Sequence, residues 1–367
     1  MKGKHAFLIF CWFFLILFFF LPFTAEAANP AKTVKIHSQM PVGHYVTKAV
    51  DLFIKEATAE TKGAFKFIHY PAQQLYKDAD MPDVLPKGGV ELAQINGAMW
   101  IGKVPETGTF SIPSFYKDLD HYYRDLYDYK HGGTLSDFIG KGWERNNVIH
   151  LCTLLYSPNN CVLCNRKIRK MEDYKGMKIR GWGKHLTACL NAWGSAAVVM
   201  SSSEVYMAMQ RGTIDGVFSG MTSHYSRKWF EVAKHVNVIE GFAPAVFDLL
   251  ANLDFWKSLS AEHKKGFLRA GLKAEIFCIN AAAETWKKAE KALQAKGVDI
   301  YYFPAEEAQK MTKAARVVLE KELLENKALP PGTVDYVLKT LADTLNAPTT
   351  WQEACKLHNE LVLSRVK

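Results

Sequence analysis

The stretch KGMKIRGWG, from Lys175 to Gly183, places an arginine near the end of a strand-like run. Because strand side chains alternate between faces, Met177 and Ile179 can point into a core while Arg180 points the other way. Trp182 shares the face of Arg180. A guanidinium held in this way can form two parallel charge-assisted hydrogen bonds with a planar anion. The alternative is an ordinary surface ion pair, for which Glu172 and Asp173 are the nearest acids in the sequence.

The cysteines are the second group of residues whose spacing could indicate chemistry. Apart from Cys11 in the N-terminal segment, only Cys161 and Cys164 form a CxxC pair among the six cysteines Cys152, Cys161, Cys164, Cys189, Cys278 and Cys355. A redox CxxC needs a helix N-terminus to stabilise the thiolate, whereas CVLC lies in an apolar, extended-looking run. We therefore favour buried thiols or a structural bridge over thiol–disulfide exchange. Without a second CxxC or a nearby histidine pair, no metal site is predicted.

The motifs of common enzymes are missing from the sequence. Ser201 to Ser203 do not lie in a GxSxG turn, there is no HExxH, and no glycine-rich phosphate loop precedes a helix. Ser201 followed by Glu204 instead predicts a capping box that starts a helix. We expect neither an enzyme nor a bound cofactor.

The N-terminus is typical of an export signal. Lys2 and Lys4 precede an apolar run from Ala6 to Phe23, and AEAA follows. Cleavage after Ala27 would satisfy the Ala-x-Ala pattern, so residues 1–27 are predicted to be a signal peptide. The apolar run is longer than usual, which leaves an uncleaved membrane anchor as the alternative.

Composition predicts a large globular chain. The 367 residues, 49% of them hydrophobic, can build two lobes. The formal charge of +9 could indicate a nucleic-acid partner. However, lysines and acids interleave in helix-like segments such as TWKKAEKALQAK, from Thr285 to Lys296, so a solvated face explains the charge better.

Apolar periodicity predicts alternating strands and helices. A strand at Lys32–Gln39, a helix ending at Gly63 and a strand at 64–71 form a β-α-β opening, which indicates a parallel sheet. The central third repeats this order. Further strands are expected at 90–98, 177–182, 196–200 and 213–220, with helices at 184–193 and 201–212 and a mostly helical region after Phe242. No flexible linker is evident, so two lobes would have to be joined by crossing strands.

Several motifs together resemble one protein family. NRKIRKMEDYKGMKIRGWG and VVMSSSEVYMAMQRGTIDGVFSG form a central block, and YPAQQL, KGGVELAQI and IPSFYKD precede it. In this order they are similar to the extracytoplasmic solute receptors of tripartite ATP-independent periplasmic (TRAP) transporters. The resemblance covers nearly the whole chain after the signal.

The resemblance implies a two-lobed α/β periplasmic-binding-protein-like fold, with mostly parallel sheets, an interlobe cleft and a helical C-terminal region. Lobe 1 would comprise residues 28–152, lobe 2 residues 153–240, and residues 241–367 would return to lobe 1. The implied protein is periplasmic, a monomer or a homodimer. It would bind a small organic anion and deliver it to the membrane permease. A carboxylate is the expected ligand and a sulfonate the alternative.

The resemblance also implies site residues. In similar proteins the arginine that matches Arg180 pairs with the ligand carboxylate, and many relatives carry asparagine where Ser219 stands. Some sialic-acid-binding relatives have an arginine at the position of Asn160, so its absence argues against that sugar acid. Because ligands bind beyond the carboxyl ends of strands, the remaining candidates are Phe218 and Trp182 from lobe 2 and Gln39, His44, Asn96 and Trp100 from lobe 1.

Overall fold

The first sheet brings together strands from both halves of the sequence. The computed structural model describes residues 31–113, 116–242 and 244–366, so the predicted signal segment lies outside it. The strand order is β2-β1-β3-β10-β4. Its members are β1 (Lys32–Ser38), β2 (Phe65–Tyr70), β3 (Leu92–Ile95), β4 (Val148–Ser157) and β10 (Ala245–Asn252). The first three are parallel, as the β-α-β opening predicted, and β10 runs antiparallel to both its neighbours.

The second sheet has the order β11-β9-β5-β8-β6-β7. Its members are β5 (Asn160–Cys164), β6 (Ile179–Gly181), β7 (Val198–Val199), β8 (Gly216–Ser219), β9 (His235–Ile239) and β11 (Asp299–Tyr302). β6 is parallel to β7 and β8, which confirms the alternating pattern of the central third, while β5 is antiparallel to both β8 and β9. Both sheets are therefore mixed, with parallel strands where helices form the crossovers.

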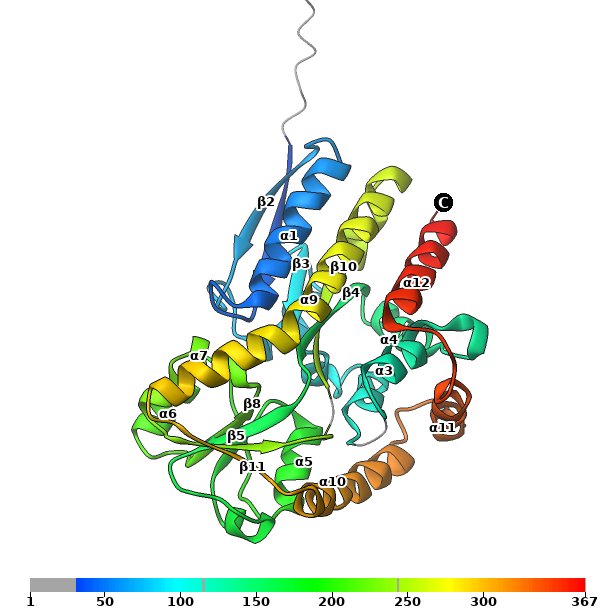
Figure 1. Ribbon diagram of the computed structural model, residues 1–367. Helices are drawn as coiled ribbons and strands as arrows, with labels where there is room; N and C mark the ends of the chain where they lie inside the picture. Colours follow the sequence, from blue (N-terminus) through cyan, green and yellow to red (C-terminus); the bar gives the residue numbers. More distant parts are fainter. Residues whose placement is uncertain (1–30, 114–115, 243, 367) are drawn as a thin grey trace, which may run out of the picture.

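The two lobes are joined by crossing strands and one long helix. The chain leaves the first sheet at the end of β4, enters the second at β5, and returns between β9 and β10. Helix α9 (Ala261–Ala295) then runs along both lobes, as Figure 1 shows. The expected boundary after Cys152 is corrected, because β4 stays in the first sheet until Ser157.

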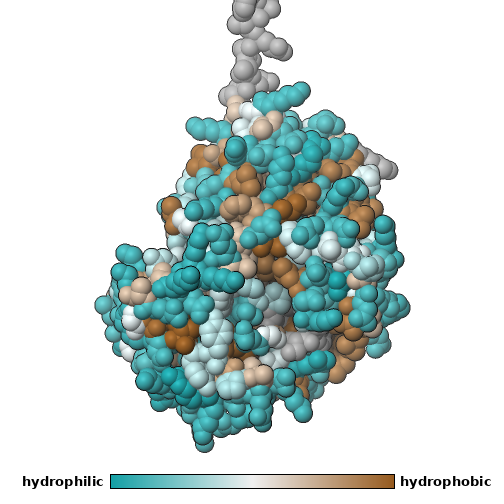
Figure 2. All heavy atoms as spheres, in the orientation of Figure 1, coloured by the Kyte–Doolittle hydropathy of each residue, from teal (hydrophilic) through white to brown (hydrophobic). Residues whose placement is uncertain are grey.

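The helices cover both lobes. The first lobe carries α1 (Tyr45–Glu60), α2 (Met81–Val84), α3 (Leu119–Tyr127), α4 (Leu135–Arg145) and α8 (Leu253–Lys257), and the second carries α5 (Lys184–Ala192), α6 (Val205–Gln210) and α7 (Met221–Ser226). None of the helices in the described ranges has an apolar stretch of the length that a bilayer requires. Figure 2 shows a mostly hydrophilic face with apolar side chains in separate patches.

The C-terminal region serves both lobes, which corrects the expectation that residues 241–367 simply return to lobe 1. β11 pairs with β9 in the second sheet, and α10 (Ala305–Glu325) packs on α5. Only then do α11 (Thr333–Thr344) and α12 (Trp351–Arg365) pack against α3 in the first lobe.

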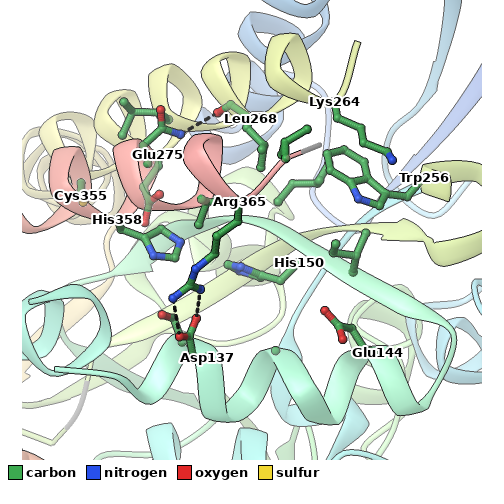
Figure 3. A pocket seen from close by; sticks show the side chains of 18 of the residues that line it. Asp137, Glu144, His150, Trp256, Lys264, Leu268, Glu275, Cys355, His358 and Arg365 are labelled. Atoms are coloured by element: carbon green, nitrogen blue, oxygen red, sulfur yellow. Dashed lines mark hydrogen bonds and ion pairs between the residues drawn. The ribbon is translucent and has the colours of Figure 1, made fainter. Parts of the chain in front are cut away.

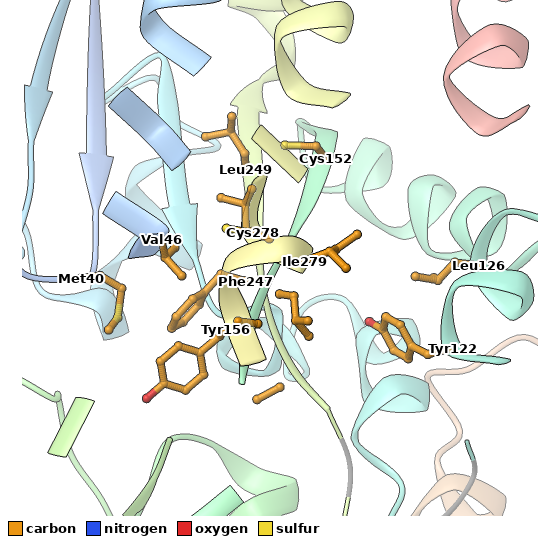
Figure 4. Packing of buried hydrophobic residues seen from close by; sticks show 14 of the residues in the cluster. Met40, Val46, Tyr122, Leu126, Cys152, Tyr156, Phe247, Leu249, Cys278 and Ile279 are labelled. Atoms are coloured by element: carbon orange, nitrogen blue, oxygen red, sulfur yellow. The ribbon is translucent and has the colours of Figure 1, made fainter. Parts of the chain in front are cut away.

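The first-lobe part of the main hydrophobic core extends to the junction, and the same cluster continues into the second lobe. Met40, Val46, Phe247 and Ile279 belong to it, and Figure 4 shows Tyr156 at its lower edge. The Tyr156 ring packs in this core while its hydroxyl points toward the second lobe. The core thus fixes a polar atom at the boundary between the lobes.

The CxxC pair lies inside β5. Side chains three residues apart on a strand point to opposite faces, and Cys161 and Cys164 accordingly belong to two different hydrophobic clusters. All six described cysteines are buried and unbridged. Burial raises the pKa of both the Cys161 and Cys164 thiols, the opposite of what exchange chemistry needs. Of the alternatives from the sequence, the structure therefore favours buried thiols.

We expect the six thiols to be unreactive until the protein unfolds. In residues 28–367, iodoacetamide should label none of them within minutes under native conditions, and all six in denaturant without a reductant. Intact-mass measurement counts the labels. A pair that stays unlabelled in denaturant would reveal a disulfide, and rapid native labelling of Cys161 would revive the exchange hypothesis.

Candidate functional site

Arg180 on β6 is a buried cation with unused hydrogen-bonding capacity. Arg180 is 2% exposed, and its Nε donates to the carbonyl oxygen of Met200 at 3.0 Å. Nη2 is buried without a hydrogen-bond partner within the part of the chain that the structure describes. An unmet buried donor costs roughly 1–3 kcal/mol, and more when it is charged. The geometry therefore calls for an acceptor at Nη2.

The two nearby acids do not supply that acceptor. Glu172 pairs with Lys310, with 2.6 Å between Oε1 and Nζ. The Asp173 carboxylate accepts from the backbone amides of Arg169 and Lys170. The surface ion pair considered for Arg180 is therefore absent from the described structure. Burial lowers the pKa of Arg180 to about 10, so the guanidinium remains charged at neutral pH.

A small cavity lies next to Arg180, at the junction of the lobes. We call it the arginine cavity. Its volume is about 20 Å³, which is roughly the room that one water molecule needs. Both lobes contribute to its lining, which comprises Gln39, Met40, Asn96, Tyr156, Arg180, Trp182, Ser202, Ser219, Ser223, Arg227, Trp229 and Phe247.

Hydroxyl groups form one wall of this cavity. Tyr156, near the end of β4, places Oη 2.7 Å from Ser219 Oγ and 2.6 Å from Ser223 Oγ. The backbone N–H of Gly220 donates to the same Oη at 3.0 Å. Ser219 ends β8, and α7 begins two residues later. A tyrosine of the first lobe is thus bonded to the strand end that the sequence singled out.

A second cavity of about 60 Å³ adjoins the first, and we call it the apolar cavity. Trp182 and Asn96 line both, so the half-buried indole stands between them. Asn160 also lines this second cavity. Most of the other lining residues are apolar: Ala98, Leu186, Phe242, Pro244, Ala245 and Val246. The acid in its lining, Asp248, pairs with His150 Nε2 at 3.1 Å. The two cavities together place a cation beside a mostly apolar compartment.

Three candidates from the sequence do not line either cavity. Phe218 is fully buried behind Trp182, with 5.4 Å between the ring centroids. Trp100 packs against Trp143 in a hydrophobic cluster of the first lobe, with 5.0 Å between the ring centroids. His44 caps α1 by accepting from Val46 N–H, and its Nε2 lies 3.0 Å from Thr222 Oγ1. Packing or the interlobe junction occupies each of these three side chains, so their direct contact with a ligand stays a prediction.

Several lining residues were not predicted from the sequence, and Arg227 is the most informative. Ser223 in α7 and Arg227 at its C-terminal cap are four residues apart, which places them on the same side of the helix. That spacing is a signal that extending the strand-end rule into the next helix would have found. Tyr156 had no such signal, because its position depends on where β4 leaves the first sheet.

The lobes are closed on each other by polar contacts. Gln73 of the first lobe bonds to Ser201 at 2.7 Å and to Ser202 at 2.9 Å, and Lys77 pairs with Glu204 at 2.8 Å. The expected capping box is therefore half formed: Glu204 accepts from Ser201 N–H, but the Ser201 hydroxyl crosses to Gln73. This segment contributes to lobe closure as well as to the start of a helix.

A much larger cavity, of about 610 Å³, lies in the first lobe between α4, α9 and α12 (Figure 3). Two of its acids and its arginine already have partners. Asp137 binds Arg365 through two hydrogen bonds of 2.9 and 3.1 Å, and Glu275 accepts from Tyr127 at 3.0 Å. Across the described residues, no cluster of histidine, cysteine or acidic side chains is arranged to hold a metal ion. The arginine cavity is the better candidate because its cation is buried and keeps an unpartnered donor among the described residues.

Comparison with protein families gives a match over most of the chain. The model described as bacterial extracellular solute-binding protein, family 7, matches residues 36–326. The C4-dicarboxylate-binding periplasmic protein of Rhodobacter capsulatus is 27% identical over 70% of this chain and 75% of its own length. The sialic acid-binding periplasmic protein of Vibrio cholerae is 24% identical over 76% of this chain and 85% of its own length.

Solved structures agree on the fold. A TRAP periplasmic solute-binding protein from Roseobacter denitrificans, with bound β-D-glucuronate, superposes with a TM-score of 0.76 at 21% identity, covering 84% of this chain and 99% of that one. Another TRAP periplasmic solute-binding protein, from Sulfurospirillum deleyianum with bound succinate, superposes with a TM-score of 0.75 at 23% identity. The superposition covers 85% of this chain and 99% of that one. The two-lobed fold implied by the sequence motifs is confirmed.

Removing the Tyr156 hydroxyl should destabilise the closed protein. In Tyr156→Phe, Ser219, Ser223 and the Gly220 N–H lose a shared partner, so we expect a loss of about 1–3 kcal/mol in the free energy of unfolding. Urea denaturation measures it. Tyr225→Phe, at a side chain 41% exposed, is the matched control and should change stability little. Equal losses in both variants would show that the hydroxyl wall has no special role.

Proposed function

Because the chain belongs to family 7 of the bacterial extracellular solute-binding proteins, the receptors of TRAP transporters, we propose that it captures a small organic carboxylate through Arg180. The family consists of binding proteins for organic acids rather than enzymes. We further propose that the predicted signal peptide, residues 1–27, exports the chain to the periplasm. There it would deliver the bound acid to the membrane permease.

One observation carries the proposal: the buried, unpartnered Nη2 of Arg180 beside a cavity between the lobes. A carboxylate oxygen is the acceptor that satisfies both its hydrogen-bonding capacity and its charge. Burial excludes water, so the pair gains more from Coulomb attraction than it would on the surface. The apolar cavity beyond Trp182 would take an aliphatic or aromatic ligand body.

Entry of the ligand requires the lobes to open. The arginine cavity has room for little more than one water, and polar contacts such as Gln73–Ser202 and His44–Thr222 hold the lobes together. We propose that the crossings at β4–β5 and β9–β10 act as hinges, in the manner of clamshell receptors. Closure around the acid would replace bulk water by the hydroxyl wall and Arg180.

A sulfonate remains the alternative ligand, because its oxygens can accept from the same guanidinium. Thiol–disulfide exchange at Cys161 and Cys164 is disfavoured, since both thiols are buried in different clusters. Both a monomer and a homodimer are compatible with ligand capture by a single chain.

Substituting Arg180 should remove most of the affinity. Truncating one member of a buried charge pair costs about 2–5 kcal/mol, so Arg180→Ala should weaken Kd by roughly 30-fold to several thousand-fold. Arg180→Lys keeps the positive charge but not the two-pronged guanidinium, so its Kd should lie between those of the wild type and Arg180→Ala. A thermal-shift screen of carboxylates and sulfonates identifies a ligand for calorimetry.

The matched control is Arg211→Ala, an exposed arginine in the same lobe, which should bind as the wild type does. If the Arg180→Ala protein were stabilised by the wild-type ligand to the same extent, Arg180 would not be the anchor.

Affinity for a carboxylate should be nearly independent of pH between 6 and 8. Arg180, with a pKa of about 10, stays protonated, and His44, whose pKa burial lowers to about 3, stays neutral. Simple carboxylic acids are ionised throughout that range. Calorimetry at pH 6, 7 and 8 should give Kd values within about twofold. A tenfold gain on acidification would mean that a group of the protein takes up a proton with the ligand.

A further inference from the structure

A second arginine lies at the arginine cavity. Arg227 follows α7, lines the cavity, and donates from Nη2 to the backbone oxygen of Gln39 at 2.8 Å. Its guanidinium carbon lies 5.7 Å from the centre of the Trp229 ring. A carbonyl and an aromatic face can hold a guanidinium but do not neutralise it. The cavity therefore has two positive charges from the second lobe.

One buried acid stands behind the opposite wall. Asp78, in the short 3-10 helix Asp78–Asp80, is 0% exposed and accepts from Gln39 Nε2 at 2.7 Å and Ser202 Oγ at 3.3 Å. The Ala79 N–H donates to its other oxygen at 2.9 Å. All three partners donate, which is the arrangement an ionised carboxylate takes. Since Gln39 and Ser202 line the cavity, Asp78 is one hydrogen bond away from it.

The other titratable groups around the arginine cavity add no charge near neutral pH, and Asp248, the acid that lines the adjoining apolar cavity, pairs with His150 Nε2 at 3.1 Å. Burial lowers the pKa of His44 to about 3 and that of His37 to about 4, and it raises the pKa of Tyr156. Lys77 and Glu204 neutralise each other at the exposed rim. Burial is the main cause of the lowered pKa of Arg180, with Asp78 opposing the shift and Arg227 adding to it. Both charges therefore act on Arg180.

We propose that the site selects a monoanion over a dianion, because Arg180, Arg227 and Asp78 together give it one net positive charge. This deepens the proposed function and rests on it. A monocarboxylate neutralises the closed site. A dicarboxylate of the same carbon chain would leave one uncompensated negative charge buried, which is strongly unfavourable. Asp78 and Arg227 thus become specificity-determining residues, while Arg180 remains the anchor.

Matched acid pairs test this proposal. The probes are butanoate with succinate, hexanoate with adipate, and gluconate with glucarate, so that each pair differs by a second carboxylate. Calorimetry at pH 7.5 should show at least tenfold tighter binding of the monoanion in every pair that binds the wild type. Equal or tighter binding of the dianion overturns the proposal.

Charge variants give a second readout. Asp78→Asn raises the net charge of the site to two and should shift the monoanion-to-dianion Kd ratio at least tenfold toward the dianion. Arg227→Gln removes a cation and should weaken the dianion more than the monoanion, whereas Arg227→Lys should keep the wild-type ratio. Unchanged ratios in both charge-changing variants, with folding verified by urea denaturation, would contradict the role of these residues.

The same experiments separate the two levels of the argument. If Arg180→Ala abolishes binding while dianions bind the wild type as well as monoanions do, Arg180 remains the anchor and only the charge selection is wrong. If none of the probes binds the wild type and the wider acid screen also finds no ligand, both proposals fall.

Discussion

The structure depends on a guanidinium that is buried with an unpartnered donor. A charge of this kind is costly in a protein interior unless it is paired, and within the described chain Arg180 donates to a carbonyl oxygen from Nε while Nη2 has no partner. The neighbouring strands β7 and β8 hold β6 on both sides, so the side chain cannot easily swing out to solvent. An anion bound at Nη2 would reduce this cost and would give the proposed ligand capture a driving force beyond apolar burial.

The interlobe contacts follow from the same constraint. Closing two lobes around an uncompensated cation is unfavourable, so other contacts have to offset it. Gln73 with Ser201 and Ser202, and Tyr156 with Ser219, supply hydrogen bonds from one lobe to the other. Asp78 sits one hydrogen bond behind the wall and supplies the opposite charge at a distance. Closure therefore depends on a polar network that surrounds the cavity, and the ligand completes it.

Sequence patterns could predict the strand ends but not which neighbours meet there. Arg180 and Ser219 were found because period-two alternation and the strand-end rule are local, and both line the arginine cavity. Trp100 and Phe218 line neither cavity, because an aromatic residue at a strand end can equally fill a core. Tyr156 and Asp78 come from distant parts of the chain, so only the folded structure brings them to Arg180. The same long-range pairing puts β11 in the second sheet.

The serine at position 219 illustrates how a short side chain at a strand end can be bonded across the lobes. A serine is shorter than an asparagine and offers one hydroxyl in place of an amide. Tyr156 reaches across from the first lobe to this hydroxyl, and Ser223 bonds to the same phenol oxygen. Hydroxyls can rotate to donate or accept, whereas an amide presents fixed donor and acceptor ends. This wall is therefore less selective in hydrogen-bond direction than an asparagine would be. Discrimination between ligands consequently shifts toward the fixed charges of Arg180, Arg227 and Asp78.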